Sequence, residues 1–260
     1  MIVLLFFVKV IWEIIEMFVD AHNHMDFYGE NLKKALDIIK KDDIKTLGCS
    51  MNLKSYIFTK KISEENENII PCFGIHPWEA HKNYGNLDQF DDYIKECKAL
   101  GEIGLDYYWV PEREKYPKMD MVFEYFLSRA RRYDKITNIH TKGAEHKILE
   151  YIKRYKLRTP IIHWYSGDMD VLKELLKCGC FFTISVDIGY SRITDEIVNI
   201  LPLDRILTET DGPDSLEWVN KRYGYPWEVE GIVRKISNIK GIQYEELKDK
   251  ISSNFNRLKL

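Results

Sequence analysis

The chain has 260 residues, of which 45% are hydrophobic and 30% charged, and its formal net charge at neutral pH is -3. This length suits one large core or two ordinary domains, and the slightly acidic balance argues against binding of nucleic acid through a global positive field. An anionic substrate would have to be attracted by a local patch or by bound cations.

The first seventeen residues precede the first strand-like run. Their apolar stretch before Lys9 is far shorter than a membrane span, and no small-residue cleavage site follows it. We interpret residues 1–17 as an N-terminal extension, either an extra helix or the result of a start assigned too early, with Met17 as the alternative beginning. A membrane-associating segment is the less favoured alternative, and no stable membrane partner is expected.

Eight short apolar or β-branched runs follow and are predicted to be strands: 18–22, 44–50, 69–75, 101–105, 136–140, 159–163, 180–185 and 205–209. Segments between them have apolar residues near i, i+3, i+4 and i+7. This spacing predicts amphipathic helices over 31–42, 87–100, 121–134, 146–156 and 170–179.

Alternation of eight strands with helices is typical of an α/β TIM barrel, in which the parallel sheet closes on itself. We therefore predict a single barrel domain over residues 18–260. A doubly wound open sheet is the alternative, but it would normally need fewer strands at this length, and the chain has no GxGxxG turn.

The five cysteines are an odd number without a CxxC pair, which suits neither a disulfide framework nor a thiolate zinc site. A reducing cytoplasm is the simplest expected location. Nothing in the residue pattern predicts an oligomeric state.

Five of the seven histidines lie at the C-terminal ends of predicted strands, where TIM barrels build their active sites: His22, His24, His76, His140 and His163. A single histidine at a strand end is more often an ordinary polar residue than a ligand. His81 and His146 fall in polar loop or helix sequence and are interpreted as exposed residues.

The spacing of His22 and His24 predicts that both imidazoles reach one cation, because residues i and i+2 of a strand point to the same side. Imidazole nitrogen is a preferred ligand of zinc and similar divalent ions. Asp20, two residues earlier on the same face, is expected to orient a ligand imidazole through a hydrogen bond.

Two carboxylates, Glu102 and Asp211, lie at or near predicted strands in apolar surroundings, where an unpaired charge is costly. With four histidines they make six candidate ligands, more than one catalytic zinc usually takes. We therefore predict two divalent cations that share a carboxylate, with zinc, manganese, cobalt, nickel or magnesium all compatible. The full candidate set is His22, His24, Glu102, His140, His163 and Asp211.

Six motifs, in this order, resemble the TatD family of metal-dependent hydrolases, which belong to the amidohydrolase-like TIM barrels: DAHNH, GIHPWEAH, GEIGLDYYW, NIHTKG, HWYSG and ETDGP. The resemblance extends from about Met17 to the closing ISSNFNRLKL. Each motif alone is weak, but the ordered set is specific.

The resemblance implies a two-ion phosphoesterase, in many family members a deoxyribonuclease that acts on DNA ends. Carried over by motif, one ion would be held by His22, His24 and Asp211, and the other by His140 and His163, with Glu102 as the bridge. Asp211 would also accept the proton of the attacking water, so the catalytic pair is Asp211 and Glu102.

Substrate contacts are expected from His76, as a donor to phosphate, and from Lys142, which stands where the family commonly has arginine. Five aromatic residues would either stack on bases or pack the loops: Tyr107, Tyr108, Trp109, Trp164 and Tyr165. A solvated helix face is the interpretation of Arg129, Arg131 and Arg132.

Residues 214–230 depart from the family pattern, so hydrolysis of a small amide, lactone or phosphoester is the alternative function. A non-enzymatic metal-binding protein is less favoured.

Overall fold

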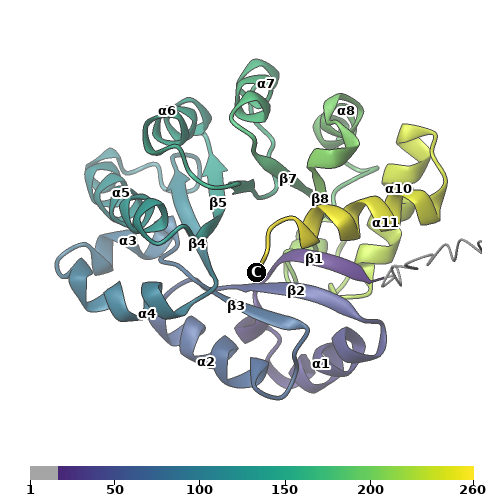
Figure 1. The fold of residues 1–260 in the computed structure, drawn as a ribbon, viewed down its shortest axis with the longest axis horizontal. Helices are drawn as coiled ribbons and strands as arrows, with labels where there is room; N and C mark the ends of the chain where they lie inside the picture. Colours follow the sequence, from purple (N-terminus) through teal and green to yellow (C-terminus); the bar gives the residue numbers. More distant parts are fainter. Residues whose placement is uncertain (1–16) are drawn as a thin grey trace, which may run out of the picture.

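The computed structural model describes residues 17–260, and its centre is a sheet of eight parallel strands (Figure 1). The strands pair in chain order: β1 (Phe18–Asn23), β2 (Ile44–Cys49), β3 (Ile69–Phe73), β4 (Ala99–Asp106), β5 (Ile136–Lys142), β6 (Ile161–Ile162), β7 (Phe181–Ile184) and β8 (Ile206–Thr208). All eight predicted strands are present, and the predicted TIM barrel is confirmed. Most of the expected N-terminal extension, residues 1–16, lies outside the described residues.

β8 lies beside β1 and nearly closes the barrel, although no regular ladder pairs these two strands within residues 17–260. The Thr208 hydroxyl donates to the Val19 carbonyl, and the backbone N–H of Asp211 donates to the His22 carbonyl at 3.0 Å. The Thr210 N–H donates to an Asp20 carboxylate oxygen at 2.8 Å. This seam therefore fixes the segment after β8 directly against the end of β1.

The helices form a ring outside the strands (Figure 1). The α-helices are α1 (Leu32–Lys41), α2 (Leu53–Ser63), α3 (Pro77–Asn83), α4 (Asp91–Glu96), α5 (Tyr116–Arg132), α6 (Glu145–Tyr155), α7 (Met169–Lys177), α8 (Arg192–Ile200), α9 (Ser215–Asn220), α10 (Glu228–Lys240) and α11 (Tyr244–Asn256). Short 3-10 turns are η1 (Met25–Phe27), η2 (Gly29–Asn31), η3 (Leu87–Phe90), η4 (Arg113–Lys115) and η5 (Leu203–Arg205). Within residues 17–260, none of these helices has the length and apolar character needed to cross a bilayer.

The helix predicted over residues 87–100 is wrong at its C-terminal end. The chain forms η3 and α4, and Cys97 then adopts an extended conformation with ψ 152°. Ala99 and Leu100 already belong to β4, where both are fully buried. Their apolar side chains fitted a helical period but are core residues of a strand.

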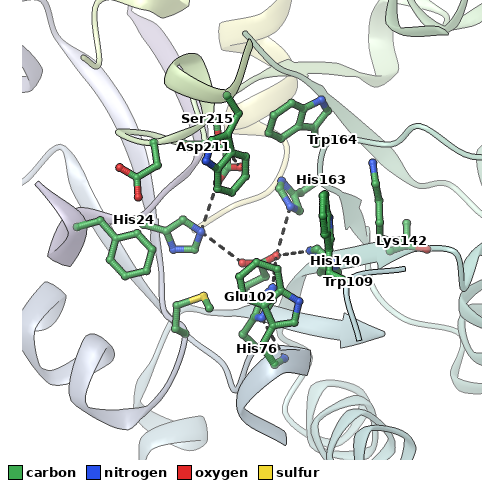
Figure 2. Close-up of a pocket in the computed structure, with 16 residues that line it drawn as sticks. His24, His76, Glu102, Trp109, His140, Lys142, His163, Trp164, Asp211 and Ser215 are labelled. Carbon is green, nitrogen blue, oxygen red and sulfur yellow. Dashed lines mark hydrogen bonds and ion pairs between the residues drawn. The ribbon is translucent and has the colours of Figure 1, made fainter. Parts of the chain in front are cut away.

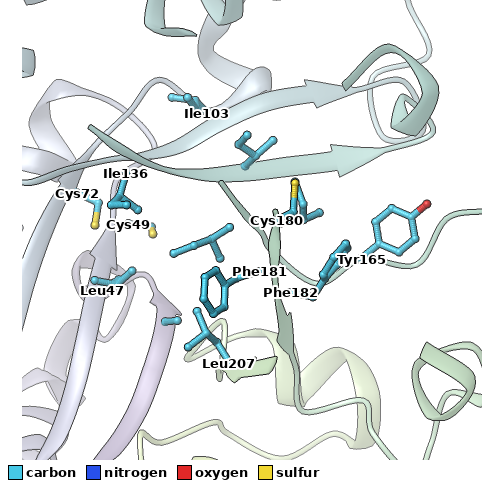
Figure 3. Close-up of a cluster of buried hydrophobic side chains, with 14 of the residues drawn as sticks. Leu47, Cys49, Cys72, Ile103, Ile136, Tyr165, Cys180, Phe181, Phe182 and Leu207 are labelled. Carbon is cyan, nitrogen blue, oxygen red and sulfur yellow. The ribbon is translucent and has the colours of Figure 1, made fainter. Parts of the chain in front are cut away.

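The core is formed by strand side chains that pack inside the barrel and beneath the helices. Figure 3 shows part of it, including Phe181 and Phe182 of β7 and Leu207 of β8, which are at most 1% exposed. Removing a buried phenylalanine side chain typically costs about 3–5 kcal/mol. All five cysteines are free thiols.

Candidate metal centre

Five imidazoles surround the Glu102 carboxylate, and Figure 2 shows four of them, those of His24, His76, His140 and His163. One oxygen, Oε2, is 3.4 Å from Nε2 of both His22 and His24. The other oxygen, Oε1, is 2.8 Å from Nδ1 of His140 and 3.2 Å from Nε2 of His163. The two oxygens of one carboxylate therefore face two different pairs of candidate ligands, and Nε2 of His76 also lies 3.4 Å from Oε1.

Asp211 joins the first of these pairs. Its Oδ1 lies 3.3 Å from Nε2 of His24 and 3.6 Å from Nε2 of His22. Ser215 donates its hydroxyl to the other carboxylate oxygen at 2.6 Å. The six residues predicted as ligands therefore come together, although they are contributed by segments that are far apart in the sequence.

Two glycines allow the strands to approach closely at this point. A Cβ atom on Gly74 would lie 2.2 Å from the carbonyl oxygen of Glu102. A Cβ atom on Gly104 would lie 2.0 Å from the carbonyl oxygen of His140. Real Cβ contacts are never so short, so the backbones that carry Glu102 and His140 depend on glycine at both positions.

Hydrogen bonds on the far side of His22 and His163 fix their tautomers. Nδ1 of His22 donates to Oδ1 of Asn138 at 2.8 Å, and the amide of Asn138 is oriented by its own donation to the Ala21 carbonyl. Nδ1 of His163 donates to the Glu209 carboxylate at 3.2 Å. In each ring, Nε2 is left as the lone-pair nitrogen that faces Glu102.

The other two imidazoles are held in the same manner. Nδ1 of His24 donates to the Cys49 carbonyl at 3.2 Å. His140 is reversed, because its Nε2 donates to Asp106 at 3.0 Å and its Nδ1 faces Glu102. In its neutral form, each of these four rings would therefore present its lone-pair nitrogen to the centre, and this is the form that binds metal.

Asp106 has four hydrogen-bond donors around its carboxylate, which is fully buried. Oδ1 accepts from the backbone N–H groups of Tyr108 and Trp109, and Oδ2 accepts from Nε1 of Trp78 as well as from His140. This carboxylate therefore connects a candidate ligand to the neighbouring loops.

The prediction that Asp20 orients a ligand imidazole is wrong. Its carboxylate accepts instead from Thr210 and from the Asn23 amide, so it secures the seam between β8 and β1. The orienting groups that sequence reasoning missed are Asn138, Glu209 and Asp106. Asn138 lies two residues before His140 on β5, and that same-face spacing was the available signal.

The ionisable groups make the centre attractive to cations. Burial would raise the pKa of Glu102, but the imidazoles of His76 and His22 and their neighbours hold it well below its usual range. Burial would lower the pKa of His24, yet the Asp211 carboxylate raises it to about 9. Protons thus collect on the imidazoles around negative carboxylates, and a bound cation would replace them.

His76 and Lys142, the predicted substrate contacts, both line the cavity above this centre. Nδ1 of His76 accepts from the Trp78 backbone N–H at 3.2 Å, so its proton is on Nε2, 3.4 Å from Glu102 Oε1. Burial lowers the pKa of His76, which favours this neutral donor form. Lys142 donates to the Ser166 hydroxyl at 2.7 Å.

The five aromatic residues considered for base stacking separate into two groups. Trp109 and Trp164 line the cavity. Tyr165 is buried, Tyr107 stacks on Tyr116 at 3.9 Å between ring centroids, and Tyr108 is exposed without lining the cavity. His81, His146 and the arginines of α5 lie away from the cavity, and Arg129 pairs with Asp88 and Asp91.

The donor atoms fit divalent cations. Two ligands that bind one ion at roughly 2.0–2.2 Å lie roughly 3.0–3.5 Å from each other. The separation between Nε2 of His22 and Nε2 of His24 is 3.3 Å, and those from Glu102 to His24 and His163 are 3.4 and 3.2 Å. Three groups of three donors lie within 4.8 Å of one another: His22, His24, Glu102; His22, His163, Glu209; and His76, Glu102, His140.

Comparison with known proteins agrees with the fold and with the chemistry of these groups. The family model described as TatD related DNase matches residues 19–259. The metal-dependent hydrolase MJ1582 of Methanocaldococcus jannaschii is 31% identical over 247 residues, which cover 91% of this chain and 94% of that one. A human protein named deoxyribonuclease TATDN3 is 26% identical, over 88% of this chain and 89% of its own.

Among solved structures, the TatD homologue YjjV of Escherichia coli K12 superimposes with a TM-score of 0.86. The match covers 94% of this chain and 98% of that one, at 21% identity. The chain therefore belongs to the TatD family of metal-dependent hydrolases.

Proposed function

We propose that this chain hydrolyses phosphodiester bonds of DNA at a two-ion centre. The observation that carries the proposal is the position of Glu102, whose two carboxylate oxygens each face a separate pair of imidazoles. Family membership supports hydrolysis, and the name of the human relative supports DNA as the substrate at 26% identity.

In this proposal His22, His24 and Asp211 hold one cation, His140 and His163 hold the other, and Glu102 contacts both. Divalent ions in such a site supply a more acidic water and neutralise negative charge on phosphoryl oxygens.

Asp211 is proposed as the acceptor of the proton that the attacking water loses. The His24 hydrogen bond and the positive imidazoles outweigh burial and hold the pKa of Asp211 at about 2, so the carboxylate is ionised at neutral pH. An Asp211→Asn variant that retains its metals should lose turnover by at least about a hundredfold, because general-base catalysis commonly contributes 10²–10⁴-fold. Full turnover by this metal-loaded variant would contradict the base role.

Two donors are proposed to hold the substrate phosphate. Nε2 of His76 carries the proton of the neutral ring and is directed at the centre (Figure 2). The ammonium of Lys142 lies across the cavity from His24 (Figure 2). Lysine supplies a point charge and not the bidentate fork of an arginine, so orientation of the phosphate would depend more on the centre itself.

The alternative is hydrolysis of a small amide, lactone or phosphoester by the same centre. The observation in its favour is that Lys142 is the one lysine or arginine lining the cavity among the described residues. A long polyanion normally needs several such contacts. A small neutral substrate would make turnover insensitive to competitor DNA and only weakly dependent on salt.

The proposal is tested with a fluorescently labelled single-stranded oligonucleotide and protein stripped by chelator, then reloaded with manganese, magnesium or zinc. We expect shortening of the oligonucleotide that depends on metal and is lost in Glu102→Ala. A matched His146→Ala variant, which changes an exposed histidine outside the cavity, should retain it. Binding of about two ions without any cleavage of DNA would reject the DNA assignment and favour the small-substrate alternative.

A further inference from the structure

The cavity above the metal centre has an unusual concentration of tryptophan. Its volume is about 350 Å³, and it is lined by four of the six tryptophans of the chain, Trp78, Trp109, Trp164 and Trp218, together with Phe27. Trp109 is 60% exposed and Trp218 is 63% exposed, although large apolar side chains are usually buried. Exposed aromatic rings grouped around a cavity indicate a binding surface.

Hydrogen bonds hold one of these indoles and the backbones of two further tryptophans. The Trp78 indole and the Trp109 backbone N–H both donate to Asp106, at 2.8 Å each. The Trp164 backbone N–H donates to the Thr183 hydroxyl at 3.0 Å. Because Asp106 also binds His140, the Trp78 indole and the backbone of Trp109 have a defined position relative to the metal centre.

The charges at the cavity lie on opposed elements. Lys142 ends β5, whereas Asp214 comes directly before α9, and its side chain makes no capping hydrogen bond with that helix. Partial burial and the nearby negative charges of Glu217 and Asp211 raise the pKa of Asp214, against the opposing effect of the His24 imidazole. A second phosphate placed on the α9 side would meet this negative charge.

We propose that the cavity accepts one nucleotide unit, with its planar base among the tryptophans, and that Asp214 excludes an additional phosphate on the α9 side. The inference rests on the proposed phosphodiesterase function and specifies its substrate: short esters with a single phosphate between two nucleosides. A volume of about 350 Å³ is at the lower end of small-molecule sites, which suits one nucleotide and not a duplex.

Sites that bind long single strands combine aromatic rings with a positively charged groove that follows the backbone. The lining of this cavity has the rings, but among residues 17–260 it has one lysine and no arginine. Stacking would therefore provide most of the affinity for the base, and length beyond one phosphate would add little.

The first test compares kcat/KM, per 3′ or 5′ end, for three substrates. They are the dithymidine monophosphate TpT, the 5′-phosphorylated form of TpT, and an oligothymidylate of twenty nucleotides. We expect TpT to be at least tenfold better than the substrates with further phosphates. Asp214→Asn should reduce that preference to about threefold or less. Equal or better turnover of the long substrate, or an unchanged preference in Asp214→Asn, would overturn the inference.

The second test measures the contribution of the wall. Trp109→Ala should raise KM for TpT about tenfold with little change in kcat, since stacking of one base contributes that much to binding. Trp227→Ala is the matched control, because Trp227 is 40% exposed but lies outside the cavity. An unchanged KM in Trp109→Ala, or the same change in both variants, would contradict the stacking role.

A binding measurement separates this inference from the proposed function. Thymidine 5′-monophosphate should quench the tryptophan fluorescence of the metal-loaded protein, and inorganic phosphate should not. The quenching by the nucleotide should be smaller in Trp109→Phe. Quenching without hydrolysis of any phosphodiester would reject the proposed function and retain the nucleotide-sized site. Hydrolysis of DNA without quenching by the nucleotide would reject the site and retain the proposed function.

Discussion

Replacement of Asp106 by asparagine should weaken metal binding and stability together. Each oxygen of the buried carboxylate accepts two hydrogen bonds, at 3.0 and 2.8 Å for Oδ1 and at 2.8 and 3.0 Å for Oδ2. Asparagine has one oxygen and one NH₂ group, so in either orientation two of the four donors would face another donor.

The magnitude follows from those two lost bonds. At about 1.5 kcal/mol for each hydrogen bond to a charged group, the free energy of unfolding should fall by about 3 kcal/mol. For a domain of this size that corresponds to a melting temperature lower by about 6–12 °C. If the amide NH₂ faces His140, the imidazole proton moves to Nδ1, the nitrogen that faces Glu102. Loss of such an orienting partner typically lowers metal affinity about 10–100-fold.

The assay is calorimetric titration of the metal-free protein with zinc or manganese, beside thermal unfolding. Asp187→Asn is the control, because Asp187 is buried and accepts from Thr194, with no hydrogen bond from a candidate ligand. The control should lose stability but bind both ions normally. Wild-type metal affinity in Asp106→Asn, or equal loss of affinity in the control, would refute the reasoning.

Three further predictions concern the glycine, the protons and the lysine of the site. Gly74→Ala should lower the free energy of unfolding by about 1–3 kcal/mol and reduce metal content, because its Cβ would lie 2.2 Å from the Glu102 carbonyl oxygen. The control is Gly231→Ala, because Gly231 lies in a helix with open space around it. That variant should be neutral or stabilising in the same thermal and metal assays. Apparent metal affinity should rise about tenfold per pH unit as the pH increases toward 9, because the pKa of His24 is about 9 and the metal must displace the proton of its imidazole. Equal affinities in calorimetry at pH 7 and pH 8 would contradict this prediction. In the metal-free protein the raised pKa has the opposite effect: it stabilises the fold fully below about pH 6.5, and this contribution is lost as pH rises through 9. Lys142→Ala should raise KM for a phosphodiester about tenfold and Lys142→Arg should restore it, whereas an unchanged KM in the alanine variant would remove the lysine from phosphate binding.

The barrel was predictable because its strands carry local patterns. Runs such as 136–140 and 180–185 are short and rich in apolar or β-branched residues, and parallel strands place their C-terminal ends at one face. The i, i+2 spacing of His22 and His24 was enough to predict that their imidazoles point to the same place, and the structure places their Nε2 atoms 3.3 Å apart.

The ring that each orienting group holds was not predictable, because the two partners come from different strands or from the segments that follow them. Asn138 on β5 binds His22 on β1, 116 residues away in sequence, and Glu209 binds His163, 46 residues away. The prediction for Asp20 was wrong for the same reason. Strand alternation predicts the face on which Asp20 lies, but its hydrogen-bond partners come from the seam between β8 and β1. The end of α4 was misplaced because Ala99 and Leu100 suit a helix and a buried strand equally.

The most direct test of the account is a crystal structure of the manganese-loaded protein with anomalous scattering at the metal edge. We expect two peaks, one beside His22, His24 and Asp211 and the other beside His140 and His163, both within bonding distance of Glu102. A single peak, or one centred between His163 and Glu209, would contradict the two-ion centre bridged by Glu102.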